Sequence, residues 1–479
     1  MFATVLLIAE ALLAGRAGLE TEIWQRAIDA AAANGGGRVV ISAGRHLVGQ
    51  LDLRSNVEIH LARRAILEGV PGIENYKVLA LPYSEGTWSA VISAVGVTNV
   101  AITGSGEIFG NGTAWPQPED YGGNQEGRRP RGVFFANCKG IRLHDFVLRD
   151  SACWGVVFKC CDGVDVRRLR IDTHANANND GIDVEAKNVL IADCDIDAGD
   201  DAICLKSNTP DFVVENVFVT NVVARSHCNA LKLGTASHGT MRNVTFVDCR
   251  TEAPRRDFID QRQGRDRRWY EEDPVRTGFF AGAILGEPAG SSAICIENVD
   301  GGTVENITYR NIVANGFRAP IFVRGGLRKR RSCGTPPSDM RIFRNVTIRN
   351  VTGESLSGLA SSITGVPGLR VEDVRLENVR IVCRGLGDAE AERTRMVPEA
   401  ADIYPDAHIF GPALPAFGLY VRHVDGLKLE NVKFELRPGD SDRREAIVLD
   451  DVDERRTEMK VQMNSTVSSR VVKDKNESL

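Results

Sequence analysis

Short runs of alternating apolar and polar residues recur along most of the chain. Each run opens with Asn or Gly, which is followed by Val or Ile, or by Leu at 427, and then by the alternating stretch. The runs lie at residues 99–102, 140–143, 163–166, 188–191, 216–219, 243–246, 306–309, 345–348 and 426–429. Alternation over so few residues predicts half-buried strands. Copies between residues 140 and 243 lie roughly 23–28 residues apart, a spacing typical of solenoid repeats.

A sandwich, a propeller and a parallel β-helix all use short strands at regular spacing. The period here is about half that of a propeller blade, and hairpin turns of the Asn-Gly type are scarce. A helix is predicted over residues 23–34, because Ile23, Ala27, Ile28 and Ala31 recur at helical spacing and three glycines follow. We therefore predict an all-β solenoid, a parallel β-helix whose N-terminal end is capped by this short helix.

The repeats predict one β-helix domain over residues 20–453. Two insertions interrupt it, at 254–292, which carries Trp269 and Tyr270, and at 384–417. A long insertion between strands is expected to form either a wall of a binding cleft or a passive excursion. Residues 1–19 are interpreted as a degenerate signal peptide or a leading helix, and 454–479 as a polar tail that frays. The apolar N-terminal run is too short to span a membrane, so no membrane partner is predicted.

Composition narrows the class of protein. The net charge of −5 over 479 residues gives no indication of a nucleic-acid partner. The 11 cysteines show no zinc-ligand spacing. We expect most of them to be buried free thiols. A disulfide framework is the less favoured alternative, since a chain this long does not need one. Nothing in the pattern sets an oligomeric state.

Three segments combine polar turns with short apolar strands, at residues 178–184, 199–205 and 228–234. Overlaying them places Asp180, Asp201 and Asn229 in one column, with Asp200 beside Asp201. Adjacent coils of such a fold lie about 4.7–4.9 Å apart, so these carboxylates are expected to crowd together. Like charges at that separation raise the pKa of at least one carboxyl, which leaves one acid protonated and the others ionised. That is the pairing needed for one proton donor and one water-activating base.

Two structural alternatives stand beside this interpretation. Asp and Asn pairs often serve only to cap their own turns. Acidic residues at 193, 195, 197, 200 and 201 also offer oxygen ligands for calcium. Strand alternation would spread the first three of these along a face, so no metal and no cofactor is predicted.

The three segments resemble glycoside hydrolase family 28, the polygalacturonase family. The resemblance rests on Asn178-x-Asp180, on Gly199-Asp200-Asp201 and on Leu231-x-Leu233-Gly234. It extends to residues 30–44 and to 106–112, and it covers roughly residues 20–450. It implies a right-handed parallel β-helix, cleavage of pectic polysaccharides with inversion and no metal. It also favours a secreted or periplasmic location and an acidic plant-type polysaccharide as the partner.

The resemblance also suggests roles for the acidic residues. Asp200 is similar to the family's general acid, and Asp180 and Asp201 are similar to the pair that activates the water. Strand alternation does not test these roles, because all three residues lie in turns at the start of strands.

Two departures from the family pattern concern the substrate. The family's histidine position is Asn229 here, and His227 lies two residues upstream. The rung expected to carry Arg-Ile-Lys reads AICIE at residues 293–297. The pattern is therefore more similar to the rhamnogalacturonan-directed and exo-acting branch.

Five residues are the candidates for substrate binding: His227, Asn229, Lys232, Arg324 and Trp154. His227 reaches the site through a bulge or is a surface histidine. Lys232 and Arg324 either replace the missing cations or are solvated side chains on a strand face. Trp154 is either a sugar-stacking platform or an aromatic at the edge of the core. The basic strip at 324–331 is expected to bind anionic sugar or to line a loop.

The predicted function is hydrolysis of a glycosidic bond in a galacturonan- or rhamnogalacturonan-type substrate. Two rivals stay open. A polysaccharide lyase on the same fold would use calcium or a basic proton abstractor. A non-catalytic carbohydrate-binding β-helix would not need three crowded acids.

Overall fold

The computed structural model describes residues 6–7, 18–85, 87–116, 129–256, 289–328, 342–461 and 467–470. The chain groups into two compact units. The first unit holds residues 1–227, 254–263 and 331–336, and the second unit holds the rest. The single domain expected over 20–453 stays a prediction. Across these described ranges, no helix has both the length and the apolar character that a membrane span requires.

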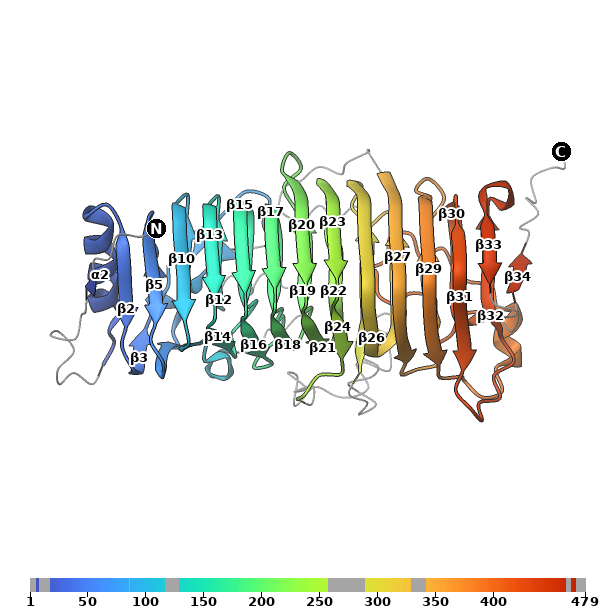
Figure 1. Cartoon of the computed structure of the whole chain (residues 1–479), viewed down its shortest axis with the longest axis horizontal. Coiled ribbons are helices and arrows are strands. Elements are labelled where there is room, and N and C mark those ends of the chain that lie inside the picture. Colours follow the sequence, from blue (N-terminus) through green and yellow to red (C-terminus); the bar gives the residue numbers. More distant parts are fainter. Residues whose placement is uncertain are drawn as a thin grey trace. The chain divides into compact units, whose positions relative to one another are not determined.

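The predicted N-terminal helix is present as α2 (Thr21–Ala33). Its apolar stripe, made by Ile23, Trp24, Ile28 and Ala31, is buried, and in Figure 1 the helix lies at the end of the first unit, beside β2. Three glycines with positive φ end it. At Gly36 a Cβ would lie 2.4 Å from the Asn56 carbonyl oxygen, so the chain needs glycine to turn into the first strand here.

Three parallel sheets build the first unit, and β15 (Val156–Arg167) and β17 (Ile182–Ala192) bend so that each belongs to two of them. The first sheet adds β2 (Gly37–Ile41), β5 (Val57–Leu61), β10 (Thr98–Gly104), β13 (Lys139–His144) and β20 (Val213–Thr220). The second has β3 (Gly44–Val48), β6 (Ala65–Gly69), β11 (Glu107–Phe109), β14 (Val147–Arg149), β16 (Arg170–Thr173), β18 (Asp195–Ala198) and β21 (Val223–Ser226). The third, named the site sheet, adds β4 (Leu51–Asp52), β9 (Ala90–Val95), β12 (Arg131–Ala136) and β19 (Ile203–Ser207).

Short elements complete the first unit. Strand β1 (Leu6–Leu7) pairs with β2, and β7 (Leu79–Ala80) pairs antiparallel with β8 (Thr87–Trp88). Two 3-10 turns, η1 (Ile73–Asn75) and η2 (Gly112–Ala114), lie between strands.

The second unit repeats the parallel arrangement, with β26 (Thr303–Gly325) shared between its sheets. One sheet adds β22 (Asn229–Ser237), β25 (Gly290–Asn298), β28 (Ser361–Thr364), β30 (Ala416–Asp425), β32 (Glu445–Val452) and β34 (Val467–Arg470). The other adds β23 (Thr240–Val247), β27 (Ile342–Ser355), β29 (Val371–Cys383), β31 (Lys428–Leu436) and β33 (Glu458–Val461), and β24 (Arg250–Glu252) also pairs with β26. Two 3-10 turns, η5 (Glu390–Thr394) and η6 (Glu454–Arg456), follow β29 and β32. The predicted right-handed parallel β-helix is confirmed.

The Asn that opens each sequence repeat marks a corner of the coil. Asn99, Asn188 and Asn216 adopt left-handed conformations with φ of 54°, 56° and 55°, which Asn and Gly tolerate better than other residues. The Asn216 side-chain amide donates to Asn188 Oδ1 at 3.1 Å, so corners of successive coils bond to each other. In the second unit Asn345 donates to Asn306 Oδ1 at 3.0 Å in the same way. The Asn at the start of a repeat is therefore explained by the left-handed backbone conformation that the corner requires.

Several other expectations have outcomes. Every cysteine in the described ranges is a free thiol and all but Cys160 are buried, as expected. The tail does not fray throughout, because β33 and β34 pair with β31 and β32. The N-terminal segment 1–19 lies outside the described residues except for 6–7 and 18–19. So do residues 257–288 of the long insertion, with Trp269 and Tyr270, and residues 329–331 of the basic strip.

Candidate active site

The two acidic segments lie in register on the site sheet of the first unit. Ile182 pairs with Ile203, and Asp183 pairs with Cys204. Ahead of these pairs, the Gly181 amide donates to the Asp201 carbonyl at 2.8 Å, which sets Asp180 beside Asp201 on neighbouring coils. The predicted alignment of these two residues is confirmed. Asn229 belongs to the second unit, where it pairs with Ser292, so its place in the acidic column stays a prediction.

The turn before β17 is held by buried hydrogen bonds. Asn178 is left-handed with φ of 55°. Asn179 is fully buried, and its amide donates to the carbonyls of Ser151 and Cys153 at 2.7 and 3.0 Å. Gly181 is required, because a Cβ there would lie 2.4 Å from the Ala202 carbonyl oxygen. Asn residues thus shape the turn, and Asp180 is available for other contacts.

Asp200 combines a turn contact with its place beside Asp201. Its Oδ1 accepts the Asp201 backbone N–H at 3.0 Å, and its carbonyl accepts the Ser226 hydroxyl at 2.6 Å. Both acids are buried, with exposed fractions of 8% for Asp200 and 3% for Asp201. Asp200 therefore does cap its own turn, as the structural alternative expected. The bond to the Asp201 backbone N–H involves one side-chain oxygen of Asp200.

Two charged residues that the sequence interpretation missed complete the cluster. Asp183 lies between the buried core residues Ile182 and Val184, so its side chain projects from the opposite face of the strand. Lys206 Nζ lies 3.3 Å from Asp183 Oδ1 and 3.8 Å from Asp180 Oδ2. Alternation along residues 180–184 and 203–206 places both side chains on the outer face, but gives no sign that this face is buried. The acid cluster is therefore Asp180, Asp183, Asp200 and Asp201, with Lys206 as a cation within it.

The cluster perturbs its own titration. Burial raises the pKa of Asp180 well above its ordinary value, and the charges of Asp183 and Asp200 add to this, while Lys206 opposes it. Burial also raises the pKa of Asp183 to about 7, again against the effect of Lys206. Because the groups interact strongly, the protons leave the cluster in shared steps. Within the described residues, Asp180 Oδ1 and both oxygens of Asp183 lack a hydrogen-bond donor. Such buried oxygens suit water or substrate hydroxyl groups.

Trp154 lies one coil before Asp180, since the Gly155 amide donates to the Asp180 carbonyl at 2.8 Å. It is 3% exposed and packs edge-to-face on Trp88 at 5.5 Å. Lys206 Nζ lies 4.4 Å from its ring centroid. Trp154 therefore packs at the edge of the core, and its role as a sugar-stacking platform stays a prediction.

His227 is buried, in contact with His174 and Arg256. Its Nε2 lies 2.9 Å from the Arg256 carbonyl, and its ring packs edge-to-face on His174 at 5.4 Å. His174 in turn bonds Asp197 at 2.9 Å. Arg256 pairs with Asp150 and Asp172 at 3.0 and 2.9 Å. His227 therefore contacts the start of the long insertion and is not a surface histidine.

The remaining candidates lie in the second unit and are all buried. Asn229 is 5% exposed and Lys232 is 3% exposed. Lys232 Nζ lies 3.7 Å from Glu297 Oε2, the last residue of the rung that lacks Arg-Ile-Lys. The interpretation of Lys232 as a solvated side chain is wrong, because it is nearly fully buried.

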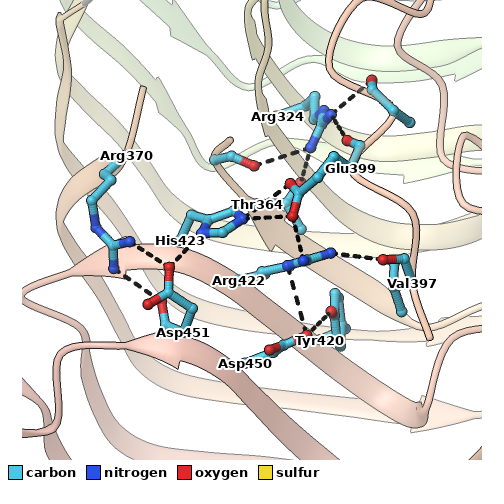
Figure 2. Close-up of polar contacts among 12 residues, drawn as sticks. Arg324, Thr364, Arg370, Val397, Glu399, Tyr420, Arg422, His423, Asp450 and Asp451 are labelled. Carbon is cyan, nitrogen blue, oxygen red and sulfur yellow. Dashed lines mark hydrogen bonds and ion pairs between the residues drawn. The ribbon is translucent and has the colours of Figure 1, made fainter. Parts of the chain in front are cut away.

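Arg324 also differs from the expectation of a solvated side chain. It is 1% exposed, and its guanidinium donates to Thr364 Oγ1, Gly365 O, Glu399 O and Ala400 O at 3.3, 3.1, 2.6 and 2.9 Å (Figure 2). Burial lowers its pKa to about 10. It is not a solvated arginine, and its role in place of the missing cations stays a prediction. Arg328 of the same basic strip forms a buried ion pair with Asp300, with Nε 3.0 Å from Oδ1.

Comparisons with known proteins agree on one family. The model described as "Glycosyl hydrolases family 28" matches residues 37–253 and 294–401. A probable polygalacturonase of Arabidopsis thaliana is 30% identical over 196 residues, 34% of this chain and 41% of that protein. A probable exopolygalacturonase B of Aspergillus terreus is 26% identical over 399 residues, 75% of this chain and 82% of that protein.

The fold has counterparts among solved structures. A family 28 exopolygalacturonase of Yersinia enterocolitica aligns with a TM-score of 0.66 at 18% identity, over 97% of this chain and 79% of that one. The match to the Arabidopsis relative spans less than half of that relative's length.

Proposed function

This chain belongs to glycosyl hydrolase family 28, and on that premise we propose that it hydrolyses glycosidic bonds in a pectic saccharide by a single displacement. The observation that carries the proposal is the buried acid cluster at the start of β17 and β19. Four carboxyl groups and one lysine on adjacent coils supply a proton donor and a proton acceptor within one site.

In the proposed reaction each carboxyl has one task. Asp200 gives its proton to the glycosidic oxygen as the bond to the anomeric carbon breaks. Asp180 and Asp201 orient a water and take its proton as the water oxygen attacks that carbon from the opposite side. The buried oxygen of Asp180 without a donor supports a water position there. The product anomer is then inverted.

We further propose that the enzyme acts on chain ends. The column that carries Asp183 continues through Val157 and Phe134 on the two preceding coils. Trp88 stacks on Phe134 at 4.9 Å, and Leu79 and Leu81 pack on the same cluster. These three residues therefore cover the outer face of the site sheet immediately before the acids, where further sugars would otherwise bind. The Aspergillus relative named an exopolygalacturonase is consistent with this mode.

The substrate class follows from the charges. The rung at 293–297 offers Glu297 where the resemblance implies two cations, and Lys232 is paired with that glutamate. A substrate with a carboxylate on every sugar is thus less well matched than one that alternates acidic and neutral sugars. The proposed substrate is a galacturonan- or rhamnogalacturonan-type oligosaccharide, with the second favoured by this charge balance.

A reducing-sugar assay over a panel of pectic and neutral polysaccharides tests the function. We expect turnover on a pectic member, release of a monosaccharide or single repeat unit without intermediate oligomers, and inversion in the proton NMR spectrum of the first product. Asp200→Asn should lower kcat by about 10²-fold or more, because general acid catalysis contributes a factor of that size. Unchanged melting of this variant is the control for folding.

The same assay separates the rivals. Product with ultraviolet absorbance from an unsaturated sugar would identify a lyase and overturn the proposal. Saccharide binding without any turnover across the panel would identify a binding protein. Full activity of Asp200→Asn would overturn the assignment of the acid.

A further inference from the structure

We propose that Lys206 is a positioning residue that favours the ionised form of Asp180, a water-activating carboxyl of the acid cluster, by supplying a fixed positive charge beside it. The proposal rests on the function proposed above, and it adds a residue that the sequence motifs do not include.

The position of Lys206 is unusual for a lysine. It lies in β19, one coil beyond Asp183, and its side chain is 12% exposed. Its Nζ is 3.3 Å from Asp183 Oδ1, 3.8 Å from Asp180 Oδ2 and 4.4 Å from the centroid of the Trp154 ring. An ammonium held between two carboxylates and an aromatic face is stabilised as a cation from each side.

A second buried lysine on the same sheet shows the contrast. Lys159 bonds Glu185, Thr209 Oγ1 and the Tyr83 carbonyl at 2.6, 2.8 and 2.6 Å, so all three of its protons are directed at acceptors. That is the geometry of an anchor. The carboxylate contacts of Lys206 are longer, at 3.3 Å to Asp183 Oδ1 and 3.8 Å to Asp180 Oδ2. Lys206 therefore acts mainly through its charge.

The carboxylates around Lys206 favour its charged form. Burial alone would lower its pKa, but the carboxylates of Asp183, Glu85 and Asp180 help to raise it well above the ordinary lysine value. Lys206 is thus charged over the whole range in which carboxyls titrate. Its charge lowers the pKa of Asp180 and of Asp183, against burial and against Asp200 and Asp201. Without it, a water-activating carboxyl would hold a proton to higher pH and be inactive as a base.

The pH dependence of kcat/KM tests this directly. The acid limb is the part of the profile where kcat/KM falls as pH decreases. Lys206→Met should move this limb to higher pH by about 1–3 units, the usual effect of removing one opposite charge within a few ångströms. At a pH below the displaced limb, kcat/KM should fall about tenfold for every pH unit by which the limb has moved. Asp183→Asn should move the limb in the opposite direction, because it removes a like charge and leaves Lys206 in place. This second variant is close to isosteric and is the control for a charge change of opposite sign, and Lys206→Gln, a neutral polar side chain, repeats the test if Lys206→Met does not fold.

Two control variants separate charge from structure. Lys206→Arg keeps the charge and should restore the wild-type limb. Lys159→Met removes a buried lysine outside the cluster and should lower stability without moving the limb. A uniform loss of kcat/KM at all pH values in Lys206→Met, or a rise in KM alone, would overturn the proposal in favour of a structural or substrate-binding role.

A measurement without substrate keeps this inference apart from the proposed function. Carbon-13 NMR of aspartate-labelled, ligand-free protein reports the apparent pKa values of the cluster, with Asp180→Asn for assignment. We expect Lys206→Met to raise them and Asp183→Asn to lower them. Unmoved titrations overturn the role of Lys206, whatever the activity. Moved titrations in a protein that hydrolyses no saccharide would instead contradict the proposed function.

Discussion

At the scale of single residues, the acid cluster combines predicted and unpredicted members. Asp180 and Asp201 follow from the sequence, because a repeat of constant period fixes which residues of successive coils are neighbours. The same alternation places Asp183 and Lys206 on the outer face of their strands. The burial of these two side chains is not predictable from the alternation. It depends on segments outside the repeat, about which the strand pattern carries no information.

Trp154 gives a prediction at this scale. Trp154→Leu should destabilise the protein by about 2–4 kcal/mol, because the ring is buried against Trp88 and supports Lys206. If the ring stacked on a sugar, the loss of ~1.4 kcal/mol of stacking would raise KM about tenfold. We expect a smaller rise in KM than this. Denaturant unfolding and steady-state kinetics measure the two effects.

Trp154→Phe is the matched variant, since it keeps an aromatic face beneath Lys206. It should lose less stability than Trp154→Leu. A large rise in KM for both variants at wild-type stability would return Trp154 to the role of a sugar platform.

At the scale of elements, long segments decide which parts of the outer face are open. In the second unit, Phe410, Leu414 and Val397 pack on Tyr420 and Val448 of β30 and β32. The polar contacts that hold this segment come from Arg324, Arg422 and His423 (Figure 2). Such a segment covers side chains that point outward from the strands. This is why the expectation of a solvated Arg324 is wrong. Pairings within the coils are predictable from the repeat, whereas packing by segments outside the repeat is not.

Arg422 tests the attachment of the segment at 397–401. Its Nη1 donates to the Val397 carbonyl at 2.8 Å, and it forms an ion pair with Glu399, which His423 also binds at 3.0 Å. Arg422→Ala should speed amide hydrogen exchange at 397–401 and leave β30 and β32 protected, because the strands keep their own hydrogen bonds. Hydrogen exchange read by mass spectrometry gives the comparison.

An exposed arginine supplies the control for Arg422. Arg375 pairs with Glu430 at 3.2 Å, and its side chain is 45% exposed, so its removal is expected to change stability by about 0–1 kcal/mol. Arg375→Ala should leave exchange at 397–401 unchanged. Equal exchange in wild type and Arg422→Ala would mean that Arg324 and the apolar contacts hold the segment without it.

At the scale of the whole molecule, the acid cluster links function to stability through pH. The pKa of Asp183 is raised in the folded state to about 7, and burial raises that of Asp180 as well. A carboxyl with a raised folded pKa binds more protons folded than unfolded. Its contribution is therefore fully present below the unfolded pKa and is lost as pH rises through the folded value. The charges that serve the proposed reaction thus oppose folding at neutral and alkaline pH.

The resulting prediction compares wild type with Asp183→Asn. Wild type should lose about 2–4 kcal/mol of unfolding free energy from the cluster as pH rises, progressively from about pH 4 to pH 7 and with little further loss above the folded pKa of Asp183. Asp183→Asn should flatten this dependence and be the more stable protein at pH 8, since it buries no charge at that position. Denaturant midpoints at several pH values measure the difference, with Asp165→Asn, at a half-exposed surface carboxyl, as the control. A parallel pH dependence in wild type and Asp183→Asn would show that Lys206 neutralises Asp183 fully. The stability cost of the site would then fall on Asp180, the other deeply buried acid, and Asp180→Asn would be the variant that flattens the curve.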